Sequence, residues 1–196
     1  MKTLLCIVLS LLSVGCFGGK PQVKLQNYGQ IHAFSLTNQS NETVTANQLK
    51  GKIWVANFIF TSCGAECPFL TRQLHLVQKL TADESDVGFV SLSVDPQTDT
   101  PARLNGYATN YGVDSSNWHF LTGEPDQLND VIRRSFLLPV AESSEEKDEL
   151  NNTNFIHSNK FVVVDQTGMA RFHVDGMLEE APSQVLAAIR QIRAEG

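Results

Sequence analysis

The chain has 196 residues, enough for one domain with a substantial hydrophobic core and too few for two comfortable ones. Hydrophobic residues make up 42% of it and charged residues 18%, as in an ordinary globular protein. A net charge of -6 argues against a nucleic-acid partner, because phosphates are bound by a basic surface.

The N-terminus has the layout of an export signal. Lys2 precedes the apolar run LLCIVLSLL, which is shorter than the roughly 20 residues that span a bilayer. Cys16 follows Gly15 as in the lipobox of bacterial lipoproteins, in which this cysteine is lipidated, although Ser13 stands where that motif usually has Leu. The alternative is plain export with cleavage nearby.

These features divide the chain into three parts. We expect residues 1–16 to be a lipoprotein-type signal peptide that ends at a lipidated Cys16, and residues 17–27 to be a tether. Residues 28–196 would form the domain. The protein is therefore expected to be exported and anchored to the membrane by lipid, facing the periplasm.

Strand and helix patterns alternate along the domain. The predicted strands are residues 32–39, 52–60, 87–95 and 117–123, with a hairpin over residues 160–174 that turns at residues 165–168. The predicted helices start at Pro68 (buried stripe Leu70, Leu74, Val77, Leu80), at Pro101 with Thr100 as N-cap, within residues 124–136, and at about Pro182. This order predicts a thioredoxin-like α/β fold, with a central mixed sheet flanked by helices and a C-terminal hairpin and helix.

Cys63 and Cys67 are the residues that most strongly indicate a functional site. A disulfide over so few residues removes little unfolded-state entropy, so a functional pair is favoured over a structural one. Cys63 follows a buried strand and Cys67 opens a helix, whose N-terminus favours a thiolate. The pair can close into a disulfide or hold one soft ion between its sulfurs. An iron–sulfur cluster needs more cysteines and structural zinc usually takes four ligands, so two sulfurs with one further ligand best suit copper.

The third ligand would be a histidine. The candidates are His32, His75, His119, His157 and His173. His75 lies off the apolar stripe of its helix, His119 and His173 fall within strand patterns, and His32 opens a strand. His157 differs, because it ends a polar loop (five acidic residues and one lysine over residues 139–151) just before a buried strand. A solvated loop histidine remains the competing interpretation.

Three segments, GKIWVANFIFTSCGAECPFL, SVDPQTDTPARLNGYA and FIHSNKFVVVDQTG, resemble in this order the SCO/SenC family of thioredoxin-like copper proteins of cytochrome oxidase assembly. The resemblance implies one copper ion, Cu(I) or Cu(II), bound by Cys63, Cys67 and His157. It also places Asp95 and Asp99 at acidic positions of the family, near the metal; turn and helix capping is the competing interpretation of these two residues.

The resemblance implies a copper chaperone that delivers copper to the binuclear centre of cytochrome c oxidase subunit II, or to another copper-accepting protein. Its thiol pair would clamp copper when reduced and release it when oxidised, with a thioredoxin-like protein as reductant. The alternative is a periplasmic thiol–disulfide reductase acting on cysteines of the oxidase or of other copper proteins, although such enzymes usually have CxxC. A peroxide-reducing thiol enzyme is a third interpretation, against which no partner arginine is found near Cys63.

Overall fold

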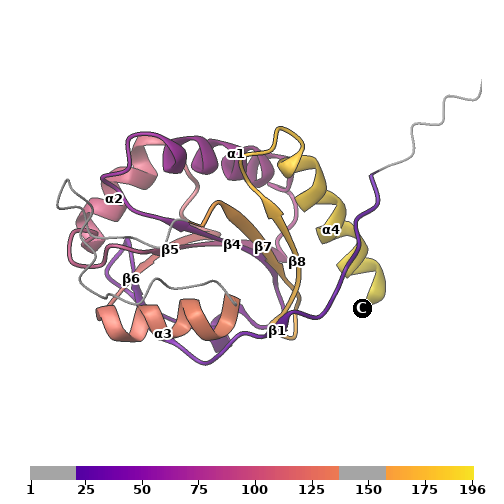
Figure 1. Ribbon diagram of the computed structural model, residues 1–196, viewed down its shortest axis with the longest axis horizontal. Helices are drawn as coiled ribbons and strands as arrows, with labels where there is room; N and C mark the ends of the chain where they lie inside the picture. Colours follow the sequence, from indigo (N-terminus) through magenta and orange to yellow (C-terminus); the bar gives the residue numbers. More distant parts are fainter. Residues whose placement is uncertain (1–20, 137–157) are drawn as a thin grey trace, which may run out of the picture.

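The computed structural model describes residues 21–136 and 158–196 (Figure 1). Eight strands of this part form one sheet, in the order β1-β8-β7-β4-β5-β6-β2-β3. The strands are β1 (Gly29–Gln30), β2 (Ser35–Asn38), β3 (Thr43–Thr45), β4 (Ile53–Ile59), β5 (Val87–Ser93), β6 (Trp118–Thr122), β7 (Lys160–Val164) and β8 (Met169–Asp175). The helices are a short 3-10 helix η1 (Ala46–Leu49), α1 (Glu66–Leu80), α2 (Pro101–Asn110), α3 (Pro125–Phe136) and α4 (Ala181–Glu195).

The centre of the sheet is parallel and its flanks are antiparallel. β4 pairs in parallel with β5, and β5 in parallel with β6, while β7 pairs antiparallel with β4 and forms a hairpin with β8. Every residue of β4 and β5 is buried, as expected of strands covered on both faces. The mixed sheet, the C-terminal hairpin and the terminal helix confirm the predicted fold class.

Helices cover both faces of the sheet. α1, α2 and α4 lie over one face, and α3 lies over the other (Figure 1). The first face packs around Trp118, Phe89 and Phe120, all without solvent exposure. β4 is buried between two apolar layers. The residues that follow its carboxyl end are therefore held in a well-defined position.

Two local predictions are wrong. α1 begins at Glu66, so that Pro68 is its third residue and Cys67 lies inside the first turn. Leu80, the last residue of α1, is 58% exposed and is not part of the buried stripe. By contrast, Thr100 caps α2 as predicted, with its side chain accepting a hydrogen bond from the Arg103 N–H at 3.4 Å.

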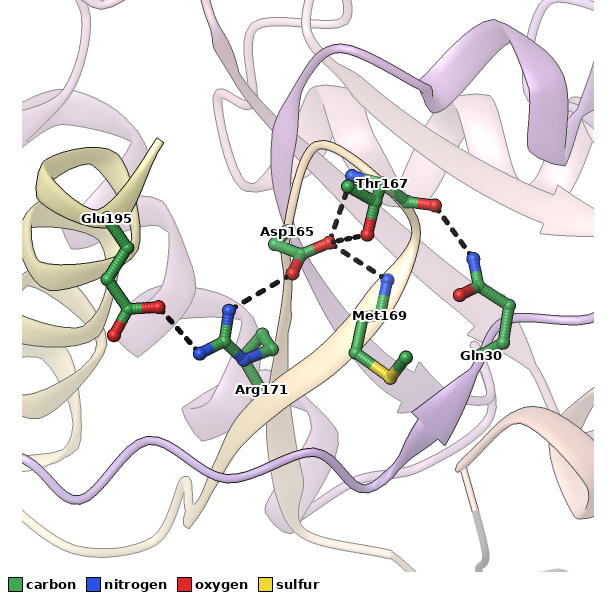
Figure 2. Close-up of polar contacts among 6 residues, drawn as sticks. All are labelled: Gln30, Asp165, Thr167, Met169, Arg171 and Glu195. Atoms are coloured by element: carbon green, nitrogen blue, oxygen red, sulfur yellow. Dashed lines mark hydrogen bonds and ion pairs between the residues drawn. The ribbon is translucent and has the colours of Figure 1, made fainter.

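The hairpin turn is joined to α4 by a polar cluster (Figure 2). Asp165 accepts hydrogen bonds from the backbone N–H groups of Thr167 and Met169, at 2.9 and 3.0 Å. Arg171 forms ion pairs with Asp165 at 3.2 Å and with Glu195 of α4 at 2.7 Å. The cluster therefore fixes the predicted turn and the end of the terminal helix together.

Part of the segment predicted as a tether contacts the domain. The Val23 backbone donates to and accepts from the Gln191 side chain of α4, at 2.8 and 3.0 Å. The Gln26 N–H donates to the Arg171 carbonyl at 2.8 Å, and Gln30 bonds the Thr167 carbonyl in the hairpin turn (Figure 2). Residues 23–26 therefore lie against α4 and β8.

Gly176, which joins β8 to the loop before α4, should not tolerate a side chain. A Cβ at this position would lie 2.6 Å from Leu70 Cδ2 and 2.9 Å from the Asn159 carbonyl oxygen. Gly176→Ala is expected to lower the free energy of unfolding by about 1–3 kcal/mol, because the neighbouring backbone must move. Urea unfolding measures this. Gly106→Ala is the control: Gly106 is exposed within α2 and an added Cβ meets nothing within 4 Å, so that variant should be at least as stable as wild type.

Candidate metal centre

The two domain cysteines meet at the carboxyl end of β4. Residues 60–65, here called the cysteine loop, connect β4 to α1; Cys63 lies in the loop, partly exposed, and Cys67 lies in the first turn of α1, 5% exposed. The Cys67 backbone N–H donates to Cys63 Sγ at 3.4 Å, and the Cys63 N–H donates to the Phe60 carbonyl at 3.1 Å. Both cysteines are free thiols. The structure therefore brings together the two thiols that the sequence singles out.

The surroundings of Cys67 favour its protonated thiol. Burial raises the pKa of Cys67 to about 12; a backbone hydrogen bond from Phe60 opposes this, and Cys63 and Glu66 raise the pKa further. Glu66 also accepts a hydrogen bond from Cys63 Sγ at 3.7 Å. The expectation that the helix N-terminus favours a thiolate is therefore wrong for Cys67, because desolvation and nearby negative charge outweigh the helix dipole. A metal that binds Cys67 Sγ must displace its proton.

The two predicted carboxylates have different positions. Asp99 is fully buried, and it accepts hydrogen bonds from the Thr61 N–H at 3.1 Å and from the Ser93 hydroxyl at 2.6 Å. Asp95 instead closes the turn before α2, where its side chain accepts from the Thr98 N–H at 3.3 Å. Asp99 thus contacts the cysteine loop, whereas the contacts of Asp95 fit the capping interpretation.

His157 lies outside the described residues, so its place in the site stays a prediction. Among the residues that the structure describes, no three His, Cys, Asp or Glu side chains are grouped so that they could hold a metal ion. Three of the other four histidines have ordinary surroundings, whereas His119 Nδ1 is buried with no hydrogen-bond partner among the described residues. His32 is exposed and precedes β2, His75 Nδ1 lies 3.0 Å from Gln78 Oε1, and His173 packs against Tyr28 with ring centroids 4.5 Å apart. Burial, with a smaller effect of Lys52, lowers the pKa of His119 on β6.

Three residues near the thiols were not predicted from the sequence. Besides Glu66, they are Thr71 and Tyr107, whose hydroxyl oxygens lie 2.8 Å apart in the core. Burial raises the pKa of the Tyr107 phenol, and the nearby cysteines add to this effect. Thr71 lies one helical turn after Cys67, a spacing that could have indicated it. Tyr107 comes from α2, and nothing in the sequence links it to the cysteines.

Comparison with solved structures finds the same architecture elsewhere. A SCO1/SenC family lipoprotein from Bacillus anthracis superposes with a TM-score of 0.76 at 30% identity, over 88% of this chain and 99% of its own. BsSco, described as a Sco-family cytochrome c oxidase assembly protein with a disulfide switch, has a TM-score of 0.73 at 31% identity, over 88% and 98%. Bradyrhizobium japonicum ScoI, solved with copper bound, shares the fold with a TM-score of 0.64 at 24% identity, over 84% and 99%.

Within residues 21–136 and 158–196, no helix is both long and apolar enough to span a membrane. The sequence model of the SCO1/SenC family matches residues 24–194, which include both cysteines, the two carboxylates and His157. This chain belongs to the SCO1/SenC family.

Proposed function

We propose that this protein is an exported copper chaperone, in which reduced Cys63 and Cys67 together with His157 bind one copper ion. Its acceptor would be the binuclear copper centre of cytochrome c oxidase subunit II, or another copper-accepting protein. The observation that carries the proposal is the hydrogen bond from the Cys67 N–H to Cys63 Sγ. It holds the two thiols side by side at the carboxyl end of β4. Membership of a family with copper-bound and oxidase-assembly members supports it.

The chemistry of the thiols suits a cargo ion. Two thiolates are soft ligands that suit Cu(I), and an imidazole nitrogen extends the set toward Cu(II). Cys63 is partly exposed, so an acceptor's ligands can reach the ion from one side, while Cys67 is buried against the core. An ion held in this way can be passed to a partner by exchange of ligands at the exposed side.

A thiol–disulfide reductase is the second candidate. The partly exposed Cys63 could attack a substrate disulfide, and the buried Cys67 could then resolve the mixed disulfide. The high pKa of Cys67 opposes this function, since resolution requires its thiolate. A reductase would turn over a disulfide substrate without copper, and this would distinguish the two candidates.

His157→Ala should remove the third ligand. Cu(II) binding is expected to weaken most, by at least about tenfold, because thiolates alone accept Cu(II) less readily than a mixed nitrogen and sulfur set. The free-thiol count should not change. Titration of Cu(II) with the sulfur-to-copper absorption as readout measures this, with His75→Ala and His119→Ala as controls. If either control lost the absorption while His157→Ala kept it, the assignment would be wrong.

The proposed location rests on Cys16. Lipidation buries acyl chains in the membrane, so Cys16→Ala should move the protein from the membrane fraction to the soluble exported fraction. Cell fractionation with an antibody against the domain measures the distribution. Equal membrane association of wild type and variant would contradict the lipid anchor.

A further inference from the structure

Asp99 is a buried carboxylate at the base of the cysteine loop. It has no solvent exposure and directly precedes Thr100, the N-cap of α2. Its Oδ1 accepts hydrogen bonds from the Thr61 N–H at 3.1 Å and from the Thr61 hydroxyl, and its Oδ2 accepts from the Ser93 hydroxyl at 2.6 Å. One side chain thus joins the cysteine loop, the end of β5 and the start of α2.

The carboxylate and the loop depend on each other. Within the described part of the chain, no Lys or Arg forms an ion pair with Asp99, so its charge is stabilised by these hydrogen bonds and by the N-terminus of α2. Hydrogen bonds to an ionised acceptor are roughly twice as strong as neutral ones. Two of the three donors belong to Thr61. Asp99 therefore holds Thr61 more firmly than a neutral side chain could.

The position of Thr61 determines where the sulfur of Cys63 lies. Between Thr61 and Cys63 lies one residue, and the Cys63 N–H closes a turn onto the Phe60 carbonyl at 3.1 Å. That turn presents Cys63 Sγ to the Cys67 N–H at 3.4 Å. We infer that Asp99 is a positioning residue, which holds the cysteine loop so that Cys63 and Cys67 can act as one pair. The inference deepens the proposed function and rests on it for the use of the pair.

The pairing can be measured without copper. With glutathione disulfide as oxidant, the two protein thiols form one disulfide and give their two protons and two electrons to the oxidant, which becomes two glutathione thiols. The equilibrium constant of this exchange reports how strongly the fold holds one sulfur against the other. A freed loop lowers the effective concentration of Cys63 at Cys67, so the constant should fall.

The experiment compares Asp99→Asn and Thr61→Val with wild type, using the full exported chain free of copper. The equilibrium constant is expected to fall about tenfold in both variants, as loss of a hydrogen bond to a charged group implies. Thr61→Ser retains the hydroxyl and should keep the wild-type constant.

Ser91→Ala is the stability control: Ser91 is fully buried in β5 and hydrogen-bonded to Asn57 at 2.6 Å and to Trp118 at 2.8 Å, away from the loop. It should lower the free energy of unfolding yet leave the constant within about twofold of wild type.

Other outcomes would overturn the inference. An unchanged or higher constant in Thr61→Val would do so, as would an equal fall in Ser91→Ala, which would show a general loss of stability. Thr61→Val decides the matter if Asp99→Asn does not fold. Because the readout contains no copper, a wild-type protein that forms the disulfide but binds no copper would contradict the proposed function alone.

Discussion

Replacing Cys63 or Cys67 by serine should lower copper affinity by more than about 100-fold, since loss of a ligand exceeds the 10- to 100-fold effect of changing a ligand's neighbour. Serine keeps the size of the side chain but has no thiolate, so Cu(I) loses one of its two soft ligands. Competition with a Cu(I) chelator of known affinity measures the change in each variant.

The two variants should differ in stability. Cys67 is 5% exposed, so a serine there buries a hydroxyl and is expected to cost about 1–3 kcal/mol of unfolding free energy. Cys63 is partly exposed, and its replacement should cost little. Ser62→Ala, next to Cys63, is the matched control and should keep wild-type copper binding. Copper binding at wild-type affinity by a folded Cys63→Ser protein would contradict the proposed ligand set.

Oxidation of the pair should have an effect as large as loss of a cysteine. A disulfide between Cys63 and Cys67 offers no thiolate, so the oxidised protein is expected to bind Cu(I) at least about 100-fold more weakly than the reduced one. Reduction should restore binding fully, because the change is confined to one bond. The disulfide is verified by mass after alkylation, and Cu(I) binding is measured by the same chelator competition.

Cys63→Ser controls for unrelated damage by the oxidant. Its weak residual binding should not change on the same treatment, because this variant cannot close the disulfide. Unchanged Cu(I) binding by wild-type protein with a verified Cys63–Cys67 disulfide would show that the two sulfurs are not the ligands. The redox state of the pair would then not control copper binding in this protein.

Features of the fold that depend on neighbouring residues could be predicted from the sequence. The buried strands β4 and β5 followed from unbroken apolar runs, and Thr100 with Pro101 marked the start of α2 because capping depends on neighbouring residues. The close approach of Cys63 and Cys67 also follows from short spacing after a strand. These features depend on few residues and little on the rest of the fold.

Features set by tertiary packing could not be predicted. The protonated state of Cys67 depends on how deeply α1 packs into the core, and its sequence position indicated only the opposing helix dipole. The hydrogen bonds from Thr61 to Asp99 join segments far apart in the chain, and Tyr107 of α2 contacts Thr71, one turn after Cys67. Leu80 fits the period of a buried stripe, but it is 58% exposed at the last residue of α1. Each of these outcomes depends on contacts that no local pattern specifies.

Copper content of the reduced, purified protein, measured beside its count of free thiols, shows whether Cys63 and Cys67 bind copper. We expect one copper per chain, with Cys63 and Cys67 protected from alkylation while the ion is bound and both reactive after its removal. A protein with both thiols reduced that retained no copper after incubation with Cu(I) would contradict copper binding by this pair.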